Sequence, residues 1–148
     1  MNKIYMMHTI SEDSKVYEAA EIYGNSNISN NSEIYGNAII INSSISSSKI
    51  CGGVIINNDA ICDKTFIYDN ARVNKSIISN VEICGNTKIY NSVQVFGKSI
   101  MSGKHFIKYN IKIYGNSRIF NESDIFNKSS NILIICGKAR LSKYRLYV

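Results

Sequence analysis

Few residues of this 148-residue chain have the types and neighbours that catalysis requires. Its two histidines, His8 and His105, are the candidates for a general base, because an imidazole exchanges protons near neutral pH. The chain has four cysteines: Cys51, Cys62, Cys84 and Cys136. None has a histidine close to it in sequence and none belongs to a C-x-x-C pair, so the sequence predicts free thiols and no metal site.

Aliphatic residues recur every six positions along most of the chain. The first run is Ile4, Ile10, Val16, Ile22, Ile28, Ile34 and Ile40; the second is Ile55, Ile61, Ile67 and Val73; the third begins at Ile77, Ile83 and Ile89 and continues to Ile125. Four residues after each aliphatic residue stands a side chain that is mostly small. A period of six fits neither an amphipathic helix nor a hairpin, but it suits a short strand followed by a corner.

The corner residues form a consensus, Ile-Tyr-Gly-Asn-Ser/Ala, which occurs at residues 22–26, 34–38 and 113–117. Glycine and asparagine adopt positive φ more readily than other residues, which suits a sharp corner. The aliphatic residue and the small fifth residue then both point inward. We expect three such repeats to close one triangular coil of about eighteen residues, with parallel pairing between successive coils.

This repeat resembles that of the bacterial hexapeptide-repeat family, in the variant with Tyr-Gly-Asn-Ala/Ser corners, and the resemblance covers nearly the whole chain. It implies an all-β fold in the form of a single-stranded left-handed parallel β-helix. About twenty-two repeats would give about seven triangular coils. We expect a single domain over residues 1–148.

The six-residue spacing fails in three places. It drops to five over residues 40–55, drops to four over 73–77 and rises to ten over 125–135. We expect bulges or altered corners there, after which the core continues in a new frame. The five-residue spacing also leaves open a right-handed pentapeptide-type helix over that short stretch.

Acyl transfer is the activity that the resemblance implies. Such enzymes form trimers, bind acetyl-CoA in the groove between neighbouring helices and use a histidine as general base, a role that would fall here to His105. However, His105 occupies the inward fifth position, stacked with Thr87 and Ser123, and no long loop is inserted to shape an acceptor site. An acetyl-CoA-dependent acyltransferase is therefore the alternative function, and we favour a protein that is not an enzyme.

Aromatic residues at the second repeat position should face outward, where they can stack in ladders or form an interface. Aromatic side chains beside arginine or lysine make good binding hot spots. The interface that we expect consists of Phe96, Tyr114, Arg118, Phe120 and Phe126. The leading hypothesis is a non-catalytic β-helix scaffold without a cofactor. It would act by protein–protein interaction or self-assembly, either binding and inhibiting a partner protein or forming a dimer or trimer.

The charge and hydropathy of the chain bound its surroundings. A formal net charge of +6 favours an acidic partner surface, whereas the absence of a basic block disfavours nucleic acid. No stretch approaches the roughly 18 apolar residues that a membrane helix needs, and the first ten residues lack the apolar core of a signal peptide. Together with free thiols, these features predict a cytoplasmic protein that does not associate with membranes.

Overall fold

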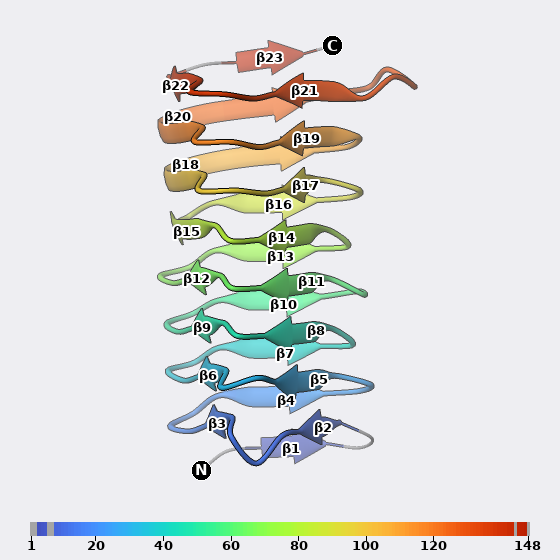
Figure 1. Cartoon of the computed structure of the whole chain (residues 1–148), viewed down its shortest axis with the longest axis vertical. Coiled ribbons are helices and arrows are strands. Elements are labelled where there is room, and N and C mark those ends of the chain that lie inside the picture. Colours follow the sequence, from blue (N-terminus) through green and yellow to red (C-terminus); the bar gives the residue numbers. More distant parts are fainter. Residues whose placement is uncertain (1–2, 6–7, 144, 148) are drawn as a thin grey trace.

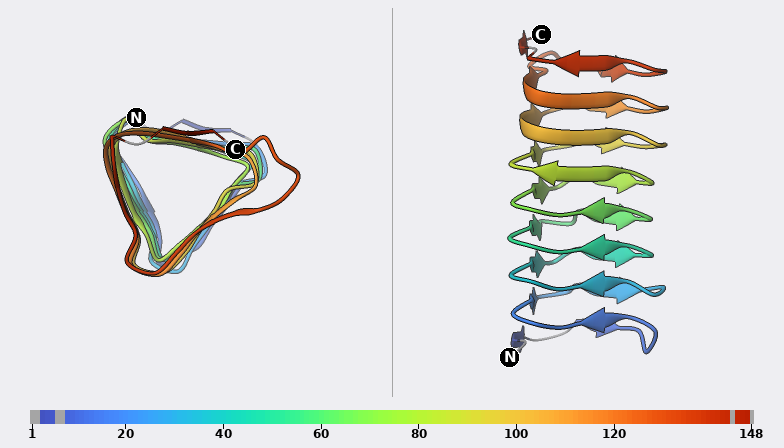
Figure 2. Two further views of the ribbon diagram at one scale, coloured as in Figure 1. Left: turned by 90° about the horizontal axis from the view of Figure 1, so that it is seen from above. Right: turned by 90° about the vertical axis from the view of Figure 1, so that its left-hand side faces the viewer.

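The computed structural model describes residues 3–5, 8–143 and 145–147, with side chains from His8 onward. In this part of the chain every regular element is a β-strand, from β1 to β23, and all strand pairs are parallel (Figure 1). Three successive strands make one turn of a triangular coil, and the turns stack along one axis (Figure 2). The predicted all-β parallel β-helix is confirmed.

Each turn contributes one strand to each of three faces. Face 1 contains β1 (Lys3–Tyr5), β4 (Glu21–Tyr23), β7 (Ile39–Ile41), β10 (Ile55–Asn57), β13 (Arg72–Asn74), β16 (Lys88–Tyr90) and β23 (Arg145–Tyr147). Face 2 contains β2 (Thr9–Ile10), β5 (Asn27–Ser29), β8 (Ser44–Ser46), β11 (Ile61–Asp63), β14 (Ile77–Ser79), β17 (Gln94–Val95), β19 (Ile111–Ile113) and β21 (Leu133–Ile135). Face 3 contains β3 (Lys15–Val16), β6 (Glu33–Ile34), β9 (Lys49–Ile50), β12 (Phe66–Ile67), β15 (Glu82–Gly85) and β22 (Arg140–Ser142).

Two long strands connect face 3 with face 1. They are β18 (Ile100–Lys108) and β20 (Arg118–Phe126), and each bends around the corner between these faces. The first half of β18 pairs with β15 and its second half with β16. Faces 1 and 3 are thereby joined into one 15-stranded sheet, whereas face 2 is a separate 8-stranded sheet.

The coil is left-handed. In Figure 1 the strands of face 1 run from left to right at the back, and those of face 2 return in front while the chain rises. Viewed from above in Figure 2, the chain therefore runs clockwise as it approaches the viewer. It makes about eight turns instead of the seven predicted. The difference arises because the tail, in which the six-residue spacing fails, continues the coil as β21, β22 and β23.

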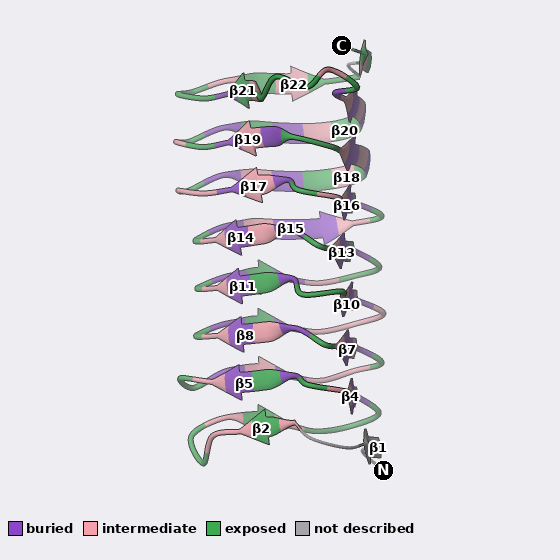
Figure 3. Cartoon of the chain, turned by 90° about the vertical axis from the view of Figure 1, so that its right-hand side faces the viewer, coloured by how far each residue is buried: buried purple, intermediate pink, exposed green. Residues whose placement is uncertain are grey.

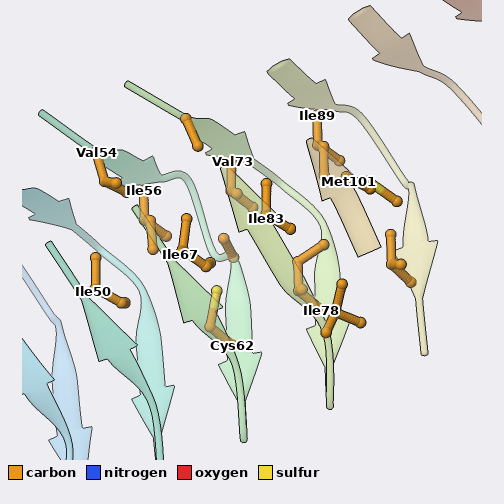
Figure 4. Packing of buried hydrophobic residues seen from close by; sticks show 14 of the residues in the cluster. Ile50, Val54, Ile56, Cys62, Ile67, Val73, Ile78, Ile83, Ile89 and Met101 are labelled. Atoms are coloured by element: carbon orange, nitrogen blue, oxygen red, sulfur yellow. The ribbon is translucent and has the colours of Figure 1, made fainter. Parts of the chain in front are cut away.

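Aliphatic side chains fill the axis of the coil in columns. On face 1 the column contains Ile22, Ile40, Ile56, Val73 and Ile89, which are paired in register and fully buried. Figure 4 shows part of this packing. Each fully buried side chain of this size contributes about 1.5–3 kcal/mol, so the columns provide the main stabilisation of a fold with very short strands.

Three predicted core positions are wrong. Ile55, Ile61 and Ile77 point outward, Ile61 with 46% of its surface exposed, and the residue after each of them, such as Cys62, is the one that is buried. The physical reason is coil length. Ile39 pairs with Ile55, only 16 residues later, so this coil has shortened corners. A shift of one residue in a strand exchanges its inner and outer sides.

The last frame break forms a small projecting loop. Ile111 pairs with Leu133, 22 residues later, so this coil is longer than its neighbours. Residues 127–132 project from the corner between faces 1 and 2 (Figure 2). The buried Asn127 anchors the loop, because its Nδ2 donates a hydrogen bond to the carbonyl of Asn110 at 3.0 Å.

The corners use glycine and small hydroxyl side chains, as the consensus predicts. Gly36 has a φ of 75°, and an added Cβ would lie 2.7 Å from the backbone nitrogen of Gly52 in the next coil. At the inward corner positions, Ser26 donates to the carbonyl of Tyr23 at 2.8 Å. A small side chain there both fits the narrow corner and satisfies a backbone acceptor.

Burial alternates along the strands, with inward residues buried and outward residues partly or fully exposed (Figure 3). Among the described residues there is no helix of the length and apolarity needed to cross a membrane.

Replacing Ile56 by alanine should destabilise the protein far more than replacing its neighbour Ile55. Ile56 is fully buried, and truncating such a side chain costs about 2–5 kcal/mol, whereas Ile55 lies on the outer side of face 1 and its truncation should cost less than about 1 kcal/mol. Denaturant unfolding of the two variants measures this difference. Equal losses would contradict the assigned register.

Candidate functional site

His105 lies where β18 bends around the corner between faces 3 and 1. Its imidazole points inward, as predicted, and only 1% of the residue is exposed. Nε2 donates a hydrogen bond to the carbonyl of Ser102 at 2.9 Å, whereas the buried Nδ1 has no partner among the described residues. The register places Thr87 and Ser123 in the coils on either side, which confirms the predicted column.

The surroundings of His105 favour a neutral ring. Burial lowers its pKa from the ordinary value of 6.5, and the hydrogen bond to Ser102 opposes this effect. A neutral imidazole has the charge state of a general base, but a base must also come within hydrogen-bond distance of the proton that it removes. Nε2 of His105 is already bonded and Nδ1 is enclosed, so the ring is arranged as a core residue.

The outer surface beside His105 is hollowed and basic. A hollow of about 740 Å³ opens along the corner between faces 3 and 1. Its lining includes Arg72 from β13, Lys88 from β16, and Lys104 and Phe106 from β18. We refer to it as the basic hollow. Three cations in one depression can bind an anionic group, and sequence reasoning missed them because they lie 16 residues apart in a region of irregular repeats.

The five predicted interface residues lie on three different faces. Phe96 and Tyr114 follow β17 and β19 in adjacent coils of face 2. Arg118 and Phe120 are on the part of β20 that belongs to face 3, whereas Phe126 is on the part that belongs to face 1. The structure therefore brings them together in pairs and does not assemble them into one surface.

Phe126 instead belongs to a ladder of aromatic rings on face 1. The ring centroids of Tyr90 and Phe106 are 5.6 Å apart, those of Phe106 and Phe126 are 5.0 Å apart, and those of Phe126 and Tyr147 are 5.2 Å apart. The four rings span the C-terminal coils, and we call them the aromatic ladder. Phe106 was missed because it precedes an inward residue instead of following one. Another predicted stack is confirmed, since Tyr17 lies over Tyr35 at 4.9 Å.

The cysteines occupy dissimilar environments. Cys62 is fully buried, and burial raises the pKa of its thiol to about 12, which makes it a poor nucleophile. Cys84 was expected to face outward, yet it is buried, and hydrogen bonding to Cys84 and Glu82 raises the pKa of Tyr68. Cys51 is half-buried and Cys136 exposed. No group of three or more metal-ligating side chains occurs within the described part of the chain.

No protein-family model matches the chain, and no curated protein matches its sequence.

The protein should lose stability as the pH falls through about 6.5. Because burial lowers the pKa of His105, the folded protein binds fewer protons than the unfolded chain just below this pH, and acid then favours unfolding. The stabilisation is complete above pH 6.5 and decreases down to the lowered pKa. Unfolding free energies between pH 8 and pH 5 should show a shallower slope for His105→Gln than for the unsubstituted protein.

The ring itself offers a second measurement that does not depend on the variant. Its titration, followed by NMR, should have a midpoint below 6.5. A midpoint at or above 6.5 would show that the imidazole is not enclosed.

Proposed function

We propose that this chain is a non-catalytic β-helix scaffold of the hexapeptide-repeat type that acts through protein–protein contact. The aromatic ladder on face 1 is the observation that carries the proposal. Four partly exposed aromatic rings in continuous contact form a rigid, apolar surface, and ordering such a surface on binding costs little entropy because the rings already restrain one another.

Cationic side chains beside the ladder strengthen the proposal. Lys108 follows Phe106 by two residues on β18, and its Nζ lies 4.4 Å from the ring centroid of Tyr109. Aromatic and cationic side chains together are the usual composition of binding hot spots, because they combine a large apolar area with directional contacts. The ladder is therefore suited to a protein surface, either of a partner or of a second copy of this chain.

The alternative, an acetyl-CoA-dependent acyltransferase with His105 as its base, receives less support. The imidazole of His105 is 1% exposed and its Nε2 is bonded to the carbonyl of Ser102. The loop at residues 127–132 is the one insertion that lengthens a coil of the described chain, and it lies at a different corner from His105. Neither feature provides a base that reaches an acceptor group.

Self-association is the contact that can be measured without a known partner. We expect sedimentation velocity to show a dimer or trimer that forms with rising protein concentration. Replacing Phe106 and Phe126 by serine should shift the equilibrium toward monomer by at least about tenfold, because buried aromatic anchors dominate such interfaces.

The matched control is Phe66→Ser with Tyr68→Ser. These two residues form an aromatic stack on face 3, with ring centroids 4.5 Å apart, and they lie outside the ladder. The control should leave the equilibrium unchanged. A protein that stays monomeric at all concentrations, or a control that acts like the ladder variant, would contradict the assignment of the ladder as an interface.

A further inference from the structure

Charge is distributed unevenly along the axis of the coil. Residues 1–69 carry eight acidic and four basic side chains, whereas residues 70–148 carry three acidic and thirteen basic ones. The net charge is therefore −4 in the first part and +10 in the second, which together give the overall +6. Because the chain rises steadily along the axis, this asymmetry makes the C-terminal coils strongly basic (Figure 1).

The basic hollow lies within these basic coils. Arg72 and Lys88 are directly opposite each other in the paired strands β13 and β16, and Lys104 is in the next coil. All three side chains are exposed. The one salt bridge within the described residues joins Lys49 to Glu33 at 3.3 Å, so none of the three is neutralised by a described carboxylate.

Such an arrangement lowers the stability of the isolated protein. Like charges directly opposite each other in paired strands repel, and nothing in the described structure compensates for the repulsion between Arg72 and Lys88. An anionic ligand would remove this repulsion on binding. The stacked cations therefore point to an anionic ligand, independently of the overall net charge.

The hollow has an apolar wall as well as a basic lining. Phe106 lines the hollow and is also the second ring of the aromatic ladder, in contact with Tyr90 and Phe126. A ligand in the hollow would thus meet cations on one side and aromatic rings on the other. This composition suits a peptide in which acidic and apolar side chains alternate, since an extended strand presents them on opposite sides.

The anionic region of the ligand must be short. Glu122 and Asp124 lie beyond Lys104, before the next cations, Lys143 and Arg145. An unbroken polyanion such as a nucleic acid, lying along the axis, would pass over these two carboxylates. The three cations of the hollow span two intervals between coils, about 10 Å, which is enough for two or three carboxylates of an extended peptide.

We propose that the basic hollow docks a short, extended, acidic segment of a partner protein, whose carboxylates contact Arg72, Lys88 and Lys104 and whose apolar side chains lie on the aromatic ladder. This inference rests on the proposed scaffold function and specifies the chemistry of the partner. The hollow supplies charge selectivity, and the ladder supplies apolar contact area.

The test uses the full chain and a fluorescent peptide of alternating glutamate and leucine, with binding followed by anisotropy. A peptide with glutamine in place of glutamate and a single-stranded oligodeoxynucleotide of the same charge serve as comparison probes. We expect the acidic peptide to bind most tightly and to bind more weakly as salt is added, because the contact is electrostatic.

Two matched triple variants locate the site. Arg72→Gln with Lys88→Gln and Lys104→Gln should weaken peptide binding at least about tenfold, because these are the proposed contacts. Arg118→Gln with Lys128→Gln and Lys138→Gln removes the same charge from exposed positions outside the hollow and should weaken it less than about twofold. Circular dichroism confirms that both variants fold.

Three results would overturn the inference. They are equal weakening by both triple variants, tighter binding of the oligodeoxynucleotide than of the acidic peptide, and absence of peptide binding together with loss of self-association in the hollow variant. The last result would assign the hollow to the acidic coils of a second copy. If the peptide does not bind but self-association still depends on the ladder, this inference fails while the proposed scaffold function stands.

Discussion

The fold depends on the packing of aliphatic side chains along the axis of the coil. No strand confined to a single face is longer than four residues, so none would be stable without its neighbours above and below. Each coil buries its inward residues only because the next coil continues the column, as in other repeat architectures. Parallel pairing and the small residues at the corners are both consequences of keeping these columns in register.

Most of the architecture could be predicted from the sequence because this constraint acts at a fixed spacing. The period of six, the small fifth residue and the Gly-Asn corners together indicate a triangular parallel coil, and the structure confirms it. The errors lie where corners lose residues. Nothing in the letters around Ile55 or Ile61 shows which of two adjacent apolar residues faces inward, because that choice depends on the conformation of the preceding corner.

The candidate site was less predictable than the fold, for a physical reason. An outward side chain is not constrained by the core, so the repeat does not determine which outward residues come together. Phe106 and Tyr147 join Phe126 only because the coils between them differ in length. Arg72 and Lys88 lie opposite each other through a register that depends on shortened corners in preceding coils. In contrast, the inward position of His105 follows from the repeat directly, and burial gives the ring a structural role.

The native cysteines provide the most direct test of the inward register, since Cys62 belongs to a core column and Cys136 is exposed. Alkylation of the folded protein, followed residue by residue with mass spectrometry, compares the two thiols without any substitution. The register described here predicts rapid modification of Cys136 and modification of Cys62 only after unfolding. Modification of Cys62 at a rate similar to that of Cys136 would place Ile61 inward instead and contradict the packing on which the fold depends.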